Sequence, residues 1–324
     1  MTSELVSVIY ITRNRLSDLM ASIESVMKQD LKDFEIIVVD QGSSDSTCDF
    51  IRMNYPEVKL IELRENYGVA GGRNIGAKYA KGKYLVFVDD DTILHTNVLK
   101  KLRIIFDKNS CVGIVAFNVL EYSTNEISNW GHSNSMKLFA NRYFETIIFP
   151  GCGHAVRRDL FEKVGGYDEE LFFWGDELSL SLKLIRDSSY KIVYAPDIVV
   201  WHRFARSNRV RWESGRMYYK VRNRLLLTWW YFPGIIFKVV FSLAYLATYA
   251  FKSMLIPSMV EQFFKGIRDF AYYIRRTHKD KKPLSYSRFF YYIKIFFMQR
   301  IAIVFGKYLI LDIKGEGSKN ICCK

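Results

Sequence analysis

Short apolar runs alternate with segments of helical periodicity along the first third of the chain, and this alternation constrains the fold more than any other feature. Residues 6–12 form a β-branched run, and apolar side chains then recur at helical spacing up to Met27, with Ser17 as the expected N-cap. Such alternation favours a mainly parallel sheet with crossover helices. The next predicted elements are a strand over 34–39, a helix over 47–53, a strand over 58–63, a helix over 71–81 and a strand over 84–88.

Polar side chains and glycines lie near the ends of these strands. A Thr-Arg-Asn turn follows the first strand, Asp40 ends the second, and Gly72 and Arg73 precede the fourth. Ligands of open α/β sheets bind at such ends, where glycine lets backbone approach a diphosphate and arginine supplies charge. At such a strand end Asp40 can contact the ligand. The alternative is that Asp40 only begins a polar turn, a role for which Asp45 is better placed.

Three consecutive aspartates, Asp89, Asp90 and Asp91, follow the fourth strand. Adjacent carboxylates repel one another unless a cation is present, which implies a hard divalent metal, Mg²⁺ or Mn²⁺, bridging a diphosphate. In an extended segment Asp89 and Asp91 point to one side, and Asp90 points to the other, toward protein or solvent. The alternative is a solvated acidic turn that ends the strand.

The middle of the chain is expected to bind the acceptor. Residues 113–194 mix short strands and helices, and the Gly-rich stretch 151–169 is loop-like. Asp176 and Glu177 lie on the first turn of an apolar-periodic helix, directly after an aromatic stretch ending in Trp174. Such carboxylates are either ordinary N-terminal helix charges or acid–base groups, and Trp174 is either a core residue or a platform for a sugar face.

The positive charge of the chain is confined to its C-terminal part. The formal charge is +13, but residues 1–205 carry 24 Lys and Arg against 28 Asp and Glu, whereas residues 206–324 carry 23 against 6. Basic and aromatic residues alternate there, which suits the anionic cytoplasmic surface of a membrane. The sequence has no zinc-finger, helix-turn-helix or RNP-like motif, so we expect no nucleic-acid partner.

The same C-terminal part contains long apolar segments. Residues 225–251 are interrupted by Lys238 and broken at Pro233-Gly234, leaving two uncharged runs of 13 residues each, shorter than the ~20 that a transmembrane helix needs. This segment, like 289–311, either spans the membrane as a unit or, as we favour, lies in the interface. We therefore predict a boundary at 224/225 between an N-terminal domain and a membrane-associated helical region at 225–324.

The compartment follows from the cysteines and the N-terminus. The five cysteines form no CxxC pair, and the first six residues include Glu4 and lack the basic start of a signal peptide. We expect the catalytic part to lie on the cytoplasmic side of the membrane, either peripheral or with an embedded C-terminal segment.

Four segments in order, VSVIYITRN, VVDQGSSDST, NYGVAGGRNIGAKYAKGKYLVFVDDDT and WGDELSLSLK, resemble the motifs of glycosyltransferase family 2 over about residues 5–225. The resemblance implies a GT-A (Rossmann-like) fold, with a mixed, mainly parallel α/β sheet and helices on both faces. It implies a catalytic domain at 1–224, with a nucleotide-sugar half at about 1–110 and an acceptor half at about 111–224. The implied nucleotide-sugar residues are Thr12, Arg13, Asn14, Asp40, Gly72, Arg73, Asp89 and Asp90. The carboxylate of Asp40, implied to lie at the nucleotide base, can accept the N3–H of uracil or thymine, which favours UDP or dTDP. The implied metal residues are Asp91, Asp89 and His202, the last of which either binds the metal or contacts the diphosphate.

The resemblance also implies a catalytic base in the acidic pair. The family usually has Glu-Asp with the second residue as base, so here Glu177 is the expected base, and Asp176 orients it or binds the acceptor with Trp174. The pair is reversed in this chain, which leaves Asp176 as the alternative base. The arginines of the loop 203–211 either close over the diphosphate or face the membrane.

The predicted activity is that of an inverting hexosyltransferase in cell-surface polysaccharide or glycoconjugate synthesis. A sugar passes from the nucleotide diphosphate to a hydroxyl of a glycan or lipid-linked acceptor. One alternative is a catalytically degenerate sugar-nucleotide binder or membrane scaffold, suggested by the reversed pair. Another is a sugar nucleotidyltransferase, but the segment TRNRLSDL lacks the GxGxR-type loop of such enzymes.

Overall fold

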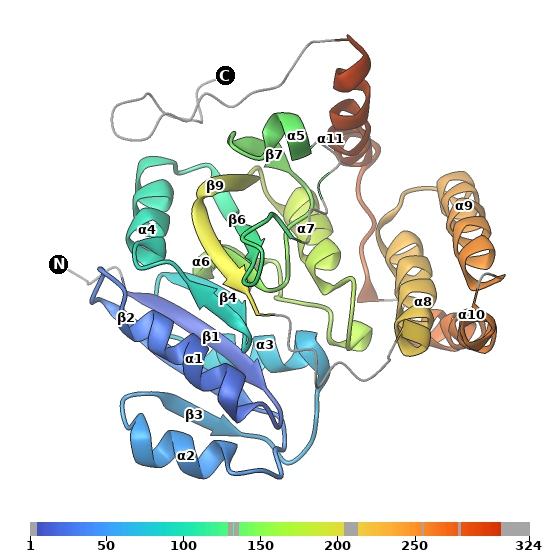
Figure 1. Ribbon diagram of the computed structural model, residues 1–324. Helices are drawn as coiled ribbons and strands as arrows, with labels where there is room; N and C mark the ends of the chain where they lie inside the picture. Colours follow the sequence, from blue (N-terminus) through green and yellow to red (C-terminus); the bar gives the residue numbers. More distant parts are fainter. Residues whose placement is uncertain are drawn as a thin grey trace.

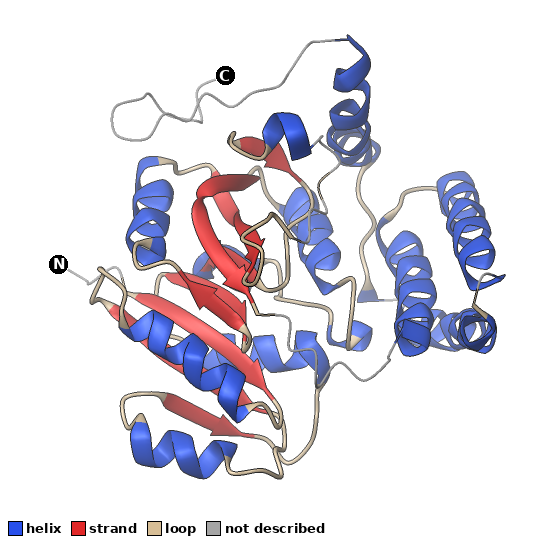
Figure 2. Ribbon diagram, viewed as in Figure 1, coloured by secondary structure: helices blue, strands red, loops and turns tan. Residues whose placement is uncertain are grey.

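A central sheet with helices packed against both faces forms the N-terminal body of the molecule, and further helices follow at one side (Figures 1 and 2). The computed structural model describes residues 5–128, 132, 136–203, 213–254, 256–277 and 280–305. The strands of this part are β1 (Val6–Thr12), β2 (Phe34–Asp40), β3 (Lys59–Glu62), β4 (Tyr84–Asp89), β5 (Thr92–Leu94), β6 (Val112–Glu121), β7 (Phe144–Thr146), β8 (Gly153–Arg157) and β9 (Lys191–His202). The helices are α1 (Leu16–Met27), α2 (Thr47–Asn54), α3 (Gly68–Tyr79), α4 (Val98–Lys108), α5 (Met136–Phe139), α6 (Arg158–Lys163), the 3₁₀ turn η1 (Glu169–Leu171), α7 (Asp176–Asp187), α8 (Glu213–Tyr231), α9 (Ile235–Met254), α10 (Pro257–Thr277) and α11 (Tyr286–Phe305).

The sheet has the strand order β3-β2-β1-β4-β8-β6-β9-β5, and β7 pairs with β9. The four strands on the nucleotide side, β3, β2, β1 and β4, are parallel, because each is connected to the next in sequence by a crossover helix. β8 is antiparallel to both β4 and β6, whereas β6 and β9 are parallel. The predicted mixed, mainly parallel sheet is confirmed.

Alternate residues of each central strand belong to two separate hydrophobic cores, one on each face of the sheet. In β1, Val8 and Tyr10 face the core formed with α1, α2 and α4, while Ile9 faces the core formed with α3, α6 and α7. β4 alternates in the same way, with Val86 on the first side and Phe87 on the second. Both faces are thus apolar, which explains why these strands appear in the sequence as continuous apolar runs.

Helix α8 connects the sheet domain to the C-terminal helices (Figure 1). Its Leu226 and Trp230 pack with α7 and α11, and its Val221 packs with α9 and α10. The helix is continuous from Glu213 to Tyr231 and so crosses the boundary predicted at 224/225. The predicted break at Pro233-Gly234 is present, because α9 begins at Ile235.

Three local predictions differ from the structure. The N-cap position of α1 is Arg15, not Ser17, and no side chain caps the helix. Helix α3 begins at Gly68, three residues before the predicted start, because Asn66 Oδ1 accepts the Gly68 N–H at 2.8 Å and starts the turn. The third strand is shorter than predicted and spans Lys59–Glu62.

Candidate active site

The carboxyl end of β4 carries the three aspartates. The parallel register pairs Ile11 of β1 with Asp89 of β4, which brings Thr12 beside Asp90. Thr12 Oγ1 donates a hydrogen bond to Asp90 at 2.8 Å, and the Arg15 guanidinium lies 2.8 Å from the other oxygen of Asp90. Asp90 therefore points toward protein, one of the two orientations predicted from the alternation of an extended segment.

Asp91 lies between Arg15 and His202. The antiparallel register of β5 and β9 pairs Thr92 with His202, so the imidazole Nε2 lies 2.8 Å from Asp91 Oδ1. Arg15 donates to the other oxygen at 2.7 Å. Burial opposes ionisation, but His202 and Arg15 outweigh it and lower the pKa of Asp91. Arg15 was not among the predicted site residues, and its only signal in the sequence is that a basic residue directly follows the polar turn.

The group around His202 fits a divalent cation. One ligand atom each of Asp89, Cys152 and His202 lies within 4.8 Å of the other two, and Asp91 adjoins the same imidazole. Carboxylate oxygens suit Mg²⁺ and Mn²⁺, and imidazole suits Mn²⁺ better than Mg²⁺. The Asp89 side chain is 35% exposed and Asp91 only 4%, so Asp89 is the more accessible of these two carboxylates.

Arg73 of α3 joins the aspartate row to the acidic pair of α7. Its buried guanidinium lies 3.2 Å from Asp89, 2.9 Å from Asp176 and 3.4 Å from Glu177. It also donates to the Gly151 carbonyl at 2.7 Å. Burial opposes the charge of this guanidinium, but the three carboxylates outweigh it and raise the pKa of Arg73. Arg73 was predicted as a nucleotide-sugar residue, and this stays a prediction; in the structure its guanidinium contacts the carboxylates of both acidic sites.

The backbone before α7 is held in uncommon conformations. Phe172, Trp174 and Gly175 have φ values of 61°, 68° and 94°. Positive φ is costly for residues with a Cβ, and such strain persists only where surrounding contacts enforce it. This turn directly precedes Asp176, the first residue of α7.

Those contacts come from α8. The Asn223 amide nitrogen lies 2.7–2.9 Å from the carbonyl oxygens of Leu171, Phe173 and Trp174. Arg222 donates to the Leu171 carbonyl at 2.9 Å. Nothing in the sequence links Arg222 and Asn223 to this loop, but their hydrogen bonds hold the backbone directly before the acidic pair.

The two acids of α7 have different surroundings. Asp176 is almost fully buried and hydrogen-bonded to Arg73, whereas the Glu177 side chain is 24% exposed and lines a cavity. Burial, together with the neighbouring Asp176 carboxylate, raises the pKa of Glu177 to about 8. A carboxylate with these properties suits proton abstraction from a hydroxyl near neutral pH.

The loops after β1 and β2 contact each other at the carboxyl end of these strands, where the nucleotide is predicted to bind. Asp40 is buried, and its carboxylate accepts hydrogen bonds from the Ser43 N–H, at 2.8 Å, and from the Ser43 hydroxyl. The local turn role expected for Asp45 is therefore shared by Asp40. Asn14, with φ 55°, accepts the Ser44 N–H at 2.7 Å and links the two loops.

The remaining predicted site residues differ in what they contact. Gly72 packs against Ile11 and Gln41, which a Cβ would meet at 2.8 and 3.1 Å, so the structure gives this glycine a packing role. Arg13 is exposed. In the arginine-rich loop, residues 206, 209 and 211 lie outside the described part, and Arg203 lies over the ring of Tyr122 at 5.5 Å.

Comparison with known proteins supports the predicted family and fold. Residues 7–165 match the model of Glycosyl transferase family 2. Over 90 residues, 27% of this chain and 36% of the relative, the chain is 40% identical to the UDP-Glc:alpha-D-GlcNAc-diphosphoundecaprenol beta-1,3-glucosyltransferase WfaP of Escherichia coli. Residues 1–349 of S. aureus TarS, solved in complex with UDP, match with a TM-score of 0.57 and 16% identity over 95% of this chain and 94% of that chain. The mannosyltransferase PcManGT from Pyrobaculum calidifontis, in complex with GDP-Man and Mn²⁺, matches with a TM-score of 0.54 and 17% identity over 94% and 88%.

The fold is thus of the GT-A type, the class shared by these solved structures. Within this class, residues 7–165 belong to glycosyltransferase family 2. The chain spans between 34% and 64% of the length of the curated relatives that match it first.

Proposed function

We propose that this chain is an inverting glycosyltransferase that transfers a sugar from UDP or dTDP to an acceptor hydroxyl. The observation that carries the proposal is the position of Arg73, whose guanidinium contacts Asp89 of the donor side and both Asp176 and Glu177 of the acceptor side. One guanidinium therefore contacts both Asp89, on the donor side, and Glu177, a carboxylate able to act as the base.

In the proposed reaction Glu177 takes the proton of the acceptor hydroxyl. The acceptor oxygen forms a bond to the anomeric carbon while the bond from that carbon to the diphosphate oxygen breaks, and the configuration inverts. Asp176, buried and bonded to Arg73, orients the base, which favours Glu177 over Asp176 for proton abstraction. Asp89, Asp91 and His202 would hold Mg²⁺ or Mn²⁺, which when bound supplies positive charge to the leaving diphosphate.

The choice of nucleotide rests on Asp40 and on one comparison. Asp40 lies at the end of β2, opposite Thr12 in the register of the two strands. A carboxylate there accepts the N3–H of uracil or thymine once its bonds to Ser43 rearrange. S. aureus TarS, which shares the fold, is solved in complex with UDP, and this supports a uridine donor.

Membrane association is proposed for helix α9. It is the one helix of the described part that is long and apolar enough to cross a membrane, and only 11% of its most apolar window is buried. Lys238 and Lys252 lie on the same helix, as expected for contact with anionic lipid. Its exposed apolar side chains are Ile235, Ile236, Val239, Val240, Leu243, Phe251 and Met254. We propose that α9 attaches the enzyme to the cytoplasmic side of the membrane for glycoconjugate synthesis on a glycan or lipid-linked acceptor.

The test is a thermal-shift screen of the full chain against UDP, dTDP, GDP and their sugars, with and without Mn²⁺. Asp91→Ala is the site variant, and Asp49→Ala, whose side chain is 77% exposed, is the control. We expect stabilisation by UDP or dTDP that needs Mn²⁺, is lost in Asp91→Ala and is kept in Asp49→Ala. No stabilisation by any nucleotide would refute the donor site and favour a degenerate scaffold.

A further inference from the structure

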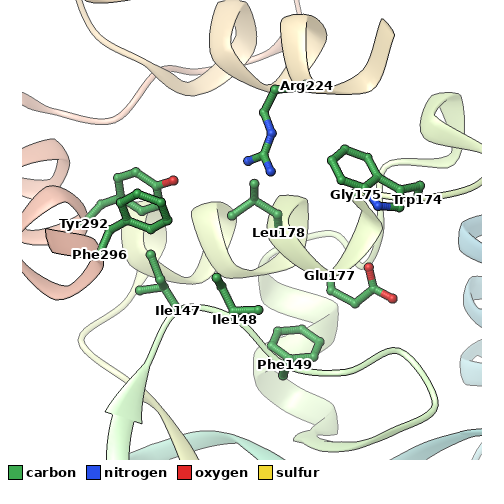
Figure 3. A pocket seen from close by; sticks show the side chains of 10 residues that line it. All are labelled: Ile147, Ile148, Phe149, Trp174, Gly175, Glu177, Leu178, Arg224, Tyr292 and Phe296. Carbon is green, nitrogen blue, oxygen red and sulfur yellow. The ribbon is translucent and has the colours of Figure 1, made fainter. Parts of the chain in front are cut away.

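A cavity of about 180 Å³ lies between the catalytic domain and the C-terminal helices (Figure 3). Glu177 and Trp174 form one side, Tyr292 and Phe296 of α11 the other, and Phe149 part of the floor. Arg224 extends from α8 into the space between these sides (Figure 3). The walls are mainly apolar and aromatic, so the cavity offers one cation and one carboxylate in otherwise apolar surroundings.

Arg224 differs from the other arginines near the site. Arg15 and Arg73 each contact carboxylates, and Arg222 donates to backbone carbonyls. Among the residues that the structure describes, no Asp or Glu forms an ion pair with Arg224, and its buried Nε has no hydrogen-bond partner. A guanidinium in apolar surroundings without a counter-ion is costly unless a ligand supplies the negative charge.

Two aromatic rings fix the Arg224 guanidinium. Its central carbon lies 5.2 Å from the ring centre of Trp174 and 4.9 Å from that of Tyr245. Tyr245 belongs to α9, the helix that carries the exposed apolar side chains. The cation in the cavity is therefore held in part by the helix proposed to contact the membrane.

We infer that this cavity is the acceptor subsite and that Arg224 binds a phosphate group of a lipid-linked acceptor. The inference rests on the proposed function and specifies its substrate class. The phosphate pairs with Arg224, the adjoining apolar chain packs on Tyr292 and Phe296, and the sugar hydroxyl lies toward Glu177. The apolar wall and the contact with α9 select a lipid phosphate over a water-soluble one, because a soluble phosphate leaves that wall unfilled.

The experiment measures binding to the full chain in detergent, in EDTA, by quenching of tryptophan fluorescence. The three probes are farnesyl phosphate, which has both an anion and an apolar chain, farnesol, which lacks the anion, and inorganic phosphate, which lacks the chain. We expect farnesyl phosphate to bind about tenfold or more tightly than either of the others, since a charge-assisted hydrogen bond and apolar burial both contribute. Equal binding of farnesyl phosphate and farnesol by the wild-type protein would overturn the inference without any variant.

Variants of Arg224 then test whether this residue binds the phosphate group. Arg224→Gln should bind farnesyl phosphate no better than farnesol, and Arg224→Lys should keep part of the preference. The control is Arg276→Gln, because Arg276 also lies over an aromatic ring, that of Tyr272 at 4.0 Å, but is exposed and does not line the cavity. A full preference for farnesyl phosphate in Arg224→Gln would overturn the assignment.

Donor binding separates this inference from the proposed function. Arg224→Gln should keep the Mn²⁺-dependent stabilisation by UDP or dTDP, because Arg224 makes no contact with the aspartate row or with Arg73. If the wild-type protein binds no nucleotide, the proposed function is refuted. The farnesyl probes would still decide whether the cavity binds a lipid phosphate. Tight binding of inorganic phosphate that does not depend on the farnesyl chain would assign the cavity to a soluble phosphate and refute the lipid assignment.

Discussion

A single methyl group placed at Gly151 tests the role of Glu177 without removing it. A Cβ built on Gly151 would lie 2.2 Å from Glu177 Oε1 and 3.1 Å from a nitrogen of Arg73. Gly151 does not have a positive φ, so its backbone accepts alanine. Since real Cβ atoms keep at least 3.0 Å from such an atom, the Glu177 carboxylate must move by roughly 1 Å, and misplacement of a catalytic group by that distance costs about 10²-fold in rate.

The stability of the Gly151→Ala protein should change little. Glu177 Oε1 is the end of a flexible side chain that is 24% exposed and borders a cavity, so the carboxylate has space to move. We expect kcat to fall about 10²-fold, equivalent to about 2.7 kcal/mol, in assays of sugar transfer from the nucleotide sugar that stabilises the protein, while nucleotide binding is unchanged. The control is Gly165→Ala: no atom lies within 4 Å of its Cβ but φ is +76°, so it should lose about 1 kcal/mol of stability and keep its kcat. A Gly151→Ala enzyme with kcat within threefold of wild type would refute the placement of the base.

Three further predictions concern pH, the loop before α7 and the membrane. Because burial raises the pKa of Glu177 to about 8 and the base acts deprotonated, kcat/KM should rise with pH up to about 8 and then level off; a Glu177→Gln enzyme that keeps this rise would contradict the assignment. Asn223→Ala removes the amide that reaches three loop carbonyls and should lower the free energy of unfolding in urea by about 2–4 kcal/mol; a change below about 0.5 kcal/mol would show that the loop does not depend on it. Replacing both Ile236 and Leu243, which are 73% and 62% exposed, by Glu should reduce co-sedimentation with anionic vesicles at least about tenfold, whereas Met53→Glu, at an exposed position of α2, should have no effect.

Much of the fold was predictable from local patterns. The apolar runs of β1, β2 and β4 and the helical spacing after β1 gave elements whose bounds agree with the structure within one or two residues at most ends. Their order alone implied a parallel sheet, because parallel strands require crossovers. The aspartates at the end of β4 were also predictable as a group, since strand ends in such sheets face the ligand.

The partners of the site residues were less predictable. The sequence indicated that Arg73 is positively charged. It did not show that the guanidinium contacts Asp89, or that it contacts Asp176 and Glu177, which lie more than a hundred residues after Arg73. Nor did it show that Asp40 is engaged with Ser43 or that Arg15 pairs with two of the aspartates. Each of these contacts depends on which loops lie next to one another.

The sequence by itself therefore determined the class of sheet, the acidic groups and the separation of an acidic domain from a basic, apolar C-terminal part. Only the tertiary structure decided that α8 holds the loop of the acidic pair through Asn223 and places Arg224 in a cavity beside Glu177. The physical reason is the separation along the sequence over which each effect acts. Hydrophobic periodicity and strand-end chemistry act within one helix or strand, so a short segment of sequence reveals them. Ion pairs and cavities form between elements, and their partners are fixed by strand order and helix packing.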